Sequence, residues 1–157
     1  MPTPELEIVA EGDLATGEHW ILRAGGSATS FSSMLETVHP DGHRDAGGMG
    51  GPVLPAGQPL NTYTGGSDRG LRRVLARADP CVARVRMELR NSPALHLDPV
   101  GHNPNLGVVF FVALLPRTVE LAAAVALDAD GHVLEPQDLS LHQQQWERWL
   151  HRDDPII

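Results

Sequence analysis

ARVRMELR, residues 83–90, alternates apolar and charged side chains over eight consecutive positions. Successive side chains of a β-strand point to opposite faces of its sheet, so this pattern gives the strand one apolar and one charged face. The apolar face carries Ala83, Val85, Met87 and Leu89. One buried and one solvated face are typical of antiparallel sheets. The segment therefore predicts an antiparallel β-strand.

Two further segments downstream have strand character. LGVVFFVALLP, residues 106–116, is apolar on both faces and β-branched or aromatic in its middle, which predicts a strand at the centre of a sheet. VELAAAVALDADGHVLE, residues 119–135, predicts a strand, a tight turn at Ala129-Asp130-Gly131 and a returning strand. Its alanine-rich middle, residues 122–126, is also compatible with a helix, and the two alternatives stay open.

Upstream, strand-length apolar runs alternate with turn signals at short intervals. The runs are LEIVAE (6–11), EHWILRAGG (18–26) and SFSSMLETVH (30–39), the last leading into a Pro40-Asp41-Gly42 turn. This spacing is typical of an all-β sandwich or barrel. We expect one domain, in which residues 1–137 form a β-sandwich and residues 138–157 add a C-terminal helix and tail.

Residues 47–70 hold eight of the sixteen glycines and three prolines. Their composition predicts a long Gly-rich loop, either functional or mobile. Tyr63 is the candidate binding residue of this loop. A small-ligand or carbohydrate site that uses Tyr63 and Trp20 is one alternative function.

The C-terminal segment SLHQQQWERWLHRDD, residues 140–154, predicts a short helix. Ser140 followed by Gln143 matches a capping box. Trp146, Trp149 and Leu150 then form an apolar stripe at helical spacing. This stripe docks either on the protein's own sheet or on a partner or second copy, and the sequence leaves both open.

Composition limits the classes of function. The chain has 157 residues, 41% hydrophobic and 20% charged, which is ordinary globular composition. Its net charge of -8 argues against nucleic-acid and membrane partners. The single cysteine, Cys81, excludes an internal disulfide. Without a secretory signal or an apolar run long enough to cross a bilayer, we expect a cytoplasmic protein.

Positive charge is concentrated in one segment. Residues 69–90 have a net charge of +5, so the remainder is near -13. Arg84, Arg86 and Arg90 would form an arginine-rich sheet face suited to bidentate contact with carboxylates or phosphates, and hence to binding an acidic surface. Alternatively, these arginines form a solvated face and pair with acidic neighbours such as Glu88.

VHPDGHRDAGGMGG, residues 38–51, raises the question of a metal site. If the chain turns at Pro40-Asp41-Gly42, His39 and His43 become cross-strand neighbours with Cβ atoms about 5 Å apart. The pair could share a metal ion if Asp45, His19, His102 or His132 supplied a third ligand. We predict turn chemistry here and keep a metal-binding protein or metalloenzyme as an alternative. LDADGHVLE, residues 127–135, does not match a calcium loop, because its glycine is the fourth residue from Asp128.

The segments VARVRMELR, GVVFFVALLP and VALDADGHVLE, within residues 82–135, resemble uncharacterised β-sandwich domains of GC-rich actinobacteria. The similarity covers about a third of the chain and lies in strand order and one hairpin. It implies an immunoglobulin-like antiparallel β-sandwich and assigns no activity.

No catalytic signature stands out: there is no nucleophile elbow, P-loop, zincin motif or dinucleotide fingerprint. We therefore predict no catalytic residues and no cofactor. The expected function is a non-catalytic interaction or accessory protein that binds a protein partner or forms a homo-oligomer. Its predicted contact residues are Tyr63, Arg84, Arg86, Arg90, Trp146 and Trp149.

Overall fold

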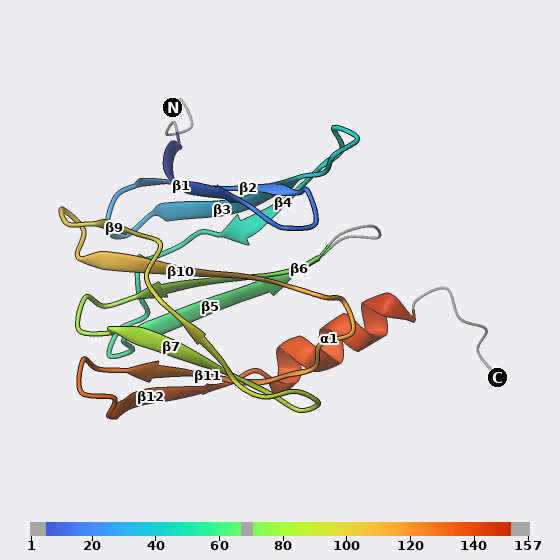
Figure 1. The fold of residues 1–157 in the computed structure, drawn as a ribbon. Helices are drawn as coiled ribbons and strands as arrows, with labels where there is room; N and C mark the ends of the chain where they lie inside the picture. Colours follow the sequence, from blue (N-terminus) through green and yellow to red (C-terminus); the bar gives the residue numbers. More distant parts are fainter. Residues whose placement is uncertain (1–5, 67–70, 152–157) are drawn as a thin grey trace.

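The computed structural model describes residues 6–66 and 71–151. These residues form three four-stranded antiparallel sheets and one helix (Figure 1). Sheet A has the order β1 (Glu7–Asp13), β2 (His19–Gly26), β3 (Phe31–Val38), β4 (Arg44–Met49). Sheet B has the order β5 (Leu60–Gly65), β6 (Arg72–Ala78), β10 (Val108–Leu115), β9 (Gly101–Asn103). Sheet C has the order β12 (Val133–Asp138), β11 (Leu121–Leu127), β7 (Arg84–Leu89), β8 (Leu95–Leu97).

The sheets stack as three layers with sheet B in the middle (Figure 1). Helix α1 (Ser140–Leu150) lies at one side of the layers, where it contacts β11 (Figure 1). One apolar core between sheets A and B includes Leu35 and Phe110. A second core between sheets B and C includes Phe111 and Met87. Phe110 and Phe111 are neighbours in β10, so strand alternation sends them into different cores. The middle sheet is therefore buried on both faces.

Strand β6 is buried at all seven positions, although three of them are arginine. Val74 faces the core shared with sheet C, and Leu75 faces the core shared with sheet A. Arg77 follows Leu75 on the side of sheet A, whereas Arg72 lies on the opposite side and reaches α1. The sequence interpretation missed this strand, because arginines are rarely buried.

Arg77 holds sheet A and the segment after β4 against sheet B. Its guanidinium donates to the Ser33 hydroxyl at 2.9 Å and to the carbonyl oxygens of Phe31 at 2.9 Å and Met49 at 2.6 Å. It also donates to the carbonyls of Gly50 and Pro52, at 3.4 and 3.1 Å. No ion pair joins it to a carboxylate of the described residues, so it acts as a buried donor to backbone carbonyls.

The strands expected from alternation are present. Val85 and Met87 of β7 are buried while Arg84 is exposed, and β10 lies inside sheet B. Residues 122–126 belong to strand β11, so the helical alternative for them is wrong. The mostly β architecture is thus confirmed as layered antiparallel sheets.

The predicted loop at residues 47–70 is not continuous, because Leu60–Gly65 forms strand β5. Tyr63 therefore lies on a strand. A Cβ atom added at Gly47 or Gly65 would come within 2.0 or 2.3 Å of the Tyr63 hydroxyl oxygen. These two glycines leave room for the tyrosine ring between the sheets, which explains part of the glycine content without a loop.

Helix α1 forms where the tryptophan stripe predicts it, but the expected capping box is wrong. The helix begins without a side-chain cap hydrogen bond, and Ser140 donates from its backbone N–H to Asp138 at 2.8 Å. Gln143 is buried and bonded elsewhere, so it cannot return to the helix start. No helix of the described residues has the length and apolarity needed to cross a membrane.

Candidate functional site

A buried polar contact attaches α1 to the sheets. The Gln143 side-chain oxygen accepts hydrogen bonds from the Arg72 guanidinium at 2.5 Å and from the backbone N–H of Leu121 at 2.8 Å. Arg72 and Gln143 are both buried, and burial lowers the pKa of Arg72 to about 10. Hydrogen bonds to a buried charged donor are costly to break, so they fix the helix in one position.

The two tryptophans of α1 have different environments. Trp146 is 6% exposed, donates from Nε1 to the Arg117 carbonyl at 3.2 Å and lies against Arg72, whose guanidinium carbon is 5.1 Å from the ring centroid. Trp149 is partly exposed and stacks on Trp146, with 5.1 Å between ring centroids and 14° between planes. The helix thus docks on its own chain, and Trp149 is the more accessible ring.

A hollow of about 230 Å³ lies between the end of β5 and α1. Its lining includes Trp146, Trp149, Arg72, His142 and Thr64, and none of the described lining residues is acidic. His142 Nδ1 and the Thr64 hydroxyl lie 2.9 Å apart. Burial, and then the nearby Arg72 charge, lower the pKa of His142 below 6.5, so the imidazole is mainly neutral at pH 7. The hollow combines aromatic walls with hydrogen-bonding groups and a buried positive charge.

A second hollow of about 270 Å³ is also bordered by Trp146. Its lining includes Arg117, Glu120, Glu147 and Leu150. Trp146 therefore borders two concave surfaces, and Trp149 borders the first. Among the described lining residues, only those of the second include carboxylates.

The predicted arginine-rich face occupies the outer side of β7. Arg84 lies 3.5 Å from Asp98, and Arg86 lies 3.1 Å from Glu88. Arg90 is exposed. Exposed ion pairs of this kind contribute about 0–1 kcal/mol each, so they leave the guanidinium groups open to exchange of partners.

The other predicted aromatic residues take part in packing. Tyr63 and Trp20 both pack against the core between sheets A and B and are only partly exposed. The Trp20 ring also covers Gly12, where an added Cβ would lie 2.8 Å from Nε1. Their rings therefore fill space between the sheets.

His39 and His43 meet across the β3–β4 hairpin as the turn predicts. Their rings stack with 5.6 Å between centroids, and the His39 N–H donates to the His43 carbonyl at 2.8 Å. Asp45 lies between them, 2.6 Å from His39 Nε2 and 3.1 Å from His43 Nε2. Glu18 lies 4.0 Å from the other ring nitrogen of His39. Asp45 is thus the third residue of this group.

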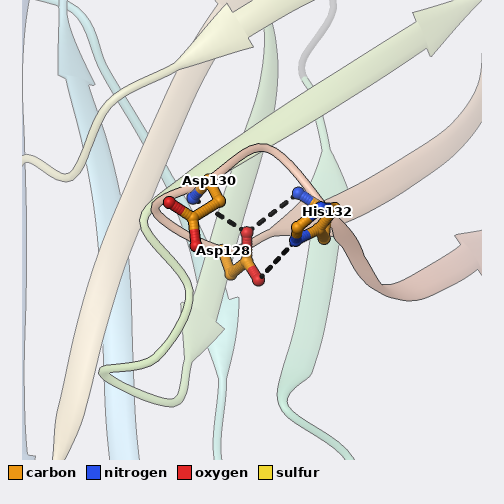
Figure 2. Close-up of side chains that lie close together, drawn as sticks. All are labelled: Asp128, Asp130 and His132. Atoms are coloured by element: carbon orange, nitrogen blue, oxygen red, sulfur yellow. Dashed lines mark hydrogen bonds and ion pairs between the residues drawn. The ribbon is translucent and has the colours of Figure 1, made fainter.

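The remaining histidines that the sequence offered as a third ligand lie in other groups. His19 is 2.7 Å from Asp13 and 3.0 Å from Glu11 on the outside of sheet A, and the Asp13 hydrogen bond raises the pKa of His19. His102 lies on β9. His132 lies in the β11–β12 turn (Figure 2).

Asp128, Asp130 and His132 have ligand atoms within 4.8 Å of one another (Figure 2). Asp128 Oδ1 accepts the backbone N–H groups of Asp130 at 2.9 Å and His132 at 2.8 Å. These hydrogen bonds, the His132 one first, lower the pKa of Asp128. They are the bonds of a tight turn with Gly131 at φ 84°, which accounts for the arrangement as hairpin chemistry.

Comparison with known proteins identifies no relative of this chain. No family model, curated protein or solved structure matches this chain. The features that bear on its function are the tryptophan pair, the two hollows and the arginine-rich face.

Proposed function

We propose that this chain is a non-catalytic interaction protein that binds another protein, or a second copy of itself, through α1 and the arginine-rich face of β7. The observation that carries the proposal is the placement of Trp149. Its partly exposed ring stacks on the immobilised Trp146, and both rings line the hollow between β5 and α1. Rigid aromatic rings beside concave surfaces are typical anchors of protein interfaces, because little side-chain entropy is lost on binding.

Charge supports an acidic group on the partner. The described lining of the hollow next to β5 has no carboxylate, although the chain contains 20 acidic residues. Arg72 adds a buried positive charge there. On the outer face of β7, Arg84 adds an exposed positive charge and Arg86 a partly exposed one. Complementary charge speeds association and selects among partners. A second copy of this chain, with its net charge of -8, also supplies acidic groups and meets the same requirement of complementary charge.

Replacing Trp149 with alanine tests the proposal. We expect sedimentation velocity to show loss of self-association, or quantitative mass spectrometry of proteins captured from host lysate to show loss of a specific partner, with affinity reduced about 30-fold. Leu141→Ser is the matched control, because Leu141 is 60% exposed on the same helix and lies outside both hollows. Circular dichroism verifies that both variants fold. If neither assay detects binding by wild type, or if Trp149→Ala binds like wild type, the proposal is wrong.

We also propose that part of the fold is an immunoglobulin-like sandwich. The segments of the resemblance supply β7, β11 and β12 of sheet C and β10 of sheet B. Sheets B and C would then be the two layers of such a sandwich. Sheet A is a third layer that the resemblance does not include.

A small-ligand site in the same hollow is the second candidate function, supported by its volume and its Thr64–His142 hydrogen bond. Tryptophan fluorescence across a panel of small organic acids and monosaccharides distinguishes the two. Saturable quenching that disappears in Trp149→Ala would favour the ligand, whereas a flat panel favours the protein partner.

A further inference from the structure

The β3–β4 hairpin carries a second group of functional side chains, away from the tryptophan pair. It consists of His39, His43, Asp45 and Glu18, which we name the hairpin cluster. We propose that His39, His43 and Asp45 bind one divalent transition-metal ion, for which zinc is the best fit, and that Glu18 orients His39. This inference is independent of the proposed interaction function.

The backbone of the hairpin holds the ligand-bearing positions in place. The Gly42 N–H donates to the His39 carbonyl at 2.9 Å, and Gly42 has φ 89°. The His43 N–H donates to the Asp41 side chain at 2.9 Å, which closes the turn. Asp45 pairs with Thr37 of β3. Ligands on a strand or directly next to a strand end, beside a closed turn, need little backbone rearrangement to bind an ion.

The donor set has the chemistry of zinc sites. Two imidazoles and a carboxylate suit zinc, and a fourth position would remain open to water. Tetrahedral zinc places neighbouring nitrogen and oxygen ligands about 3.3 Å apart, given bonds of about 2.0–2.2 Å. The Asp45 carboxylate lies 2.6 Å from His39 Nε2 and 3.1 Å from His43 Nε2, so both imidazoles are already directed at one carboxylate.

His39, His43 and Asp45 do not yet bring one ligand atom each within 4.8 Å of one another, so binding would require a side chain to move. The imidazole rings are stacked with 5.6 Å between centroids, and each Nε2 contacts a different oxygen of Asp45. The His43 side chain is 45% exposed and has room to turn toward His39. The side chains of His39 and Asp45 are only 9% and 11% exposed, and they supply the fixed part of the site.

Two neighbouring groups fit an outer shell. Glu18 lies 4.0 Å from His39 Nδ1, the nitrogen that would not bind the ion. A carboxylate in this position fixes the tautomer and raises the basicity of a metal-binding imidazole. The hydroxyl of Thr37 is buried without a hydrogen-bond partner, and Thr37 lies directly across from Asp45. A metal-bound water would give that hydroxyl a partner.

The other two acidic clusters with a histidine lack these features. The Asp13 side chain, next to His19, is 85% exposed. In the β11–β12 turn, the His132 side chain is 79% exposed, and the backbone already occupies Asp128. Exposed side chains lose more conformational freedom when they bind an ion, and water competes with the ion for them. We therefore expect neither of these clusters to bind zinc, and both serve as internal controls.

Isothermal titration of metal-free, untagged protein with zinc chloride, and with cobalt chloride followed by visible absorption, tests the proposal. We expect one ion per chain and the absorption of tetrahedral cobalt. His43→Gln should weaken binding beyond the roughly 10- to 100-fold effect of losing an outer-shell partner, and Glu18→Gln should fall within that range. His43→Gln is the primary variant, because its exposed side chain is removable without loss of the fold.

His19→Gln and His132→Gln are the matched controls and should bind zinc like wild type. The absence of stoichiometric binding in wild type would overturn the proposal. Binding that survives His43→Gln and Asp45→Asn, or that disappears in His132→Gln, would place the ion elsewhere and overturn it equally. Circular dichroism of each metal-free variant confirms that lost binding is not lost folding.

Discussion

Replacing Arg77 with methionine should lower the free energy of unfolding by about 3–5 kcal/mol. Arg77 is fully buried in the middle sheet and donates five hydrogen bonds, four of them to backbone carbonyls. Methionine fills similar space but donates none, so the carbonyls of sheet A and of the segment after β4 would remain buried without partners.

The magnitude follows from two opposing effects. Five bonds from a charged donor, at about 1.5 kcal/mol each, contribute about 7 kcal/mol. Burial lowers the pKa of Arg77 well below its usual value, to about 10, which corresponds to a cost of about 3 kcal/mol that methionine removes. The difference is about 4 kcal/mol, a large part of the stability of a small domain.

Urea unfolding followed by tryptophan fluorescence and circular dichroism measures this change. Arg84→Met is the control, because Arg84 is exposed and its removal should cost less than about 1 kcal/mol. Arg77→Lys keeps the charge but has three donors without the planar fork, so it should recover only part of the loss. An Arg77→Met protein that unfolds within 1 kcal/mol of wild type would refute the argument.

Three further predictions concern the helix, pH and backbone packing. Gln143→Leu removes the acceptor shared by Arg72 and the Leu121 N–H, so it should destabilise the protein by about 2–3 kcal/mol and shift Trp146 emission to longer wavelength. Burial lowers the pKa of His142, so the unfolded chain binds the proton more readily. The free energy of unfolding should therefore fall as the pH drops from about 6.5 through the lowered pKa of His142. The midpoint of urea unfolding should show this pH dependence in wild type and lose it in His142→Gln. Gly48→Ala would place a Cβ 1.9 Å from a backbone oxygen, so its thermal midpoint should fall further than that of Gly131→Ala, which meets open space at φ 84°.

Local patterns predicted the strands because their signal lies within a few residues. Alternation at residues 83–90 fixed which face of β7 is buried, and the Pro40-Asp41-Gly42 turn placed His39 beside His43. Both features depend on neighbours in sequence. The three-layer arrangement depends on pairings such as β6 with β10, whose partners are 31 to 43 residues apart and which periodicity does not encode.

The candidate site was harder to predict for the same reason. Gln143 matched a capping box three residues after Ser140, yet its acceptor is used by Arg72, 71 residues away. Asp45 was named as one of several possible third ligands, and only the hairpin register shows that it lies between the two imidazoles. Polar contacts that join distant strands leave no period in the sequence.

The arginines of β6 show why this sheet is central to the molecule. Strand alternation directs Arg72 toward α1 and Arg77 toward sheet A, so one strand holds both neighbouring elements. Each guanidinium meets uncharged acceptors: carbonyls at the ends of strands and loops, a serine hydroxyl and a glutamine side chain. An apolar residue in either place would leave those acceptors buried and unpaired, whereas a guanidinium satisfies several in one geometry. Apolar contacts would tolerate a shifted layer or helix, but these directional bonds do not. The position of Trp149 therefore depends on Arg72, which holds α1 through Gln143 and lies against Trp146.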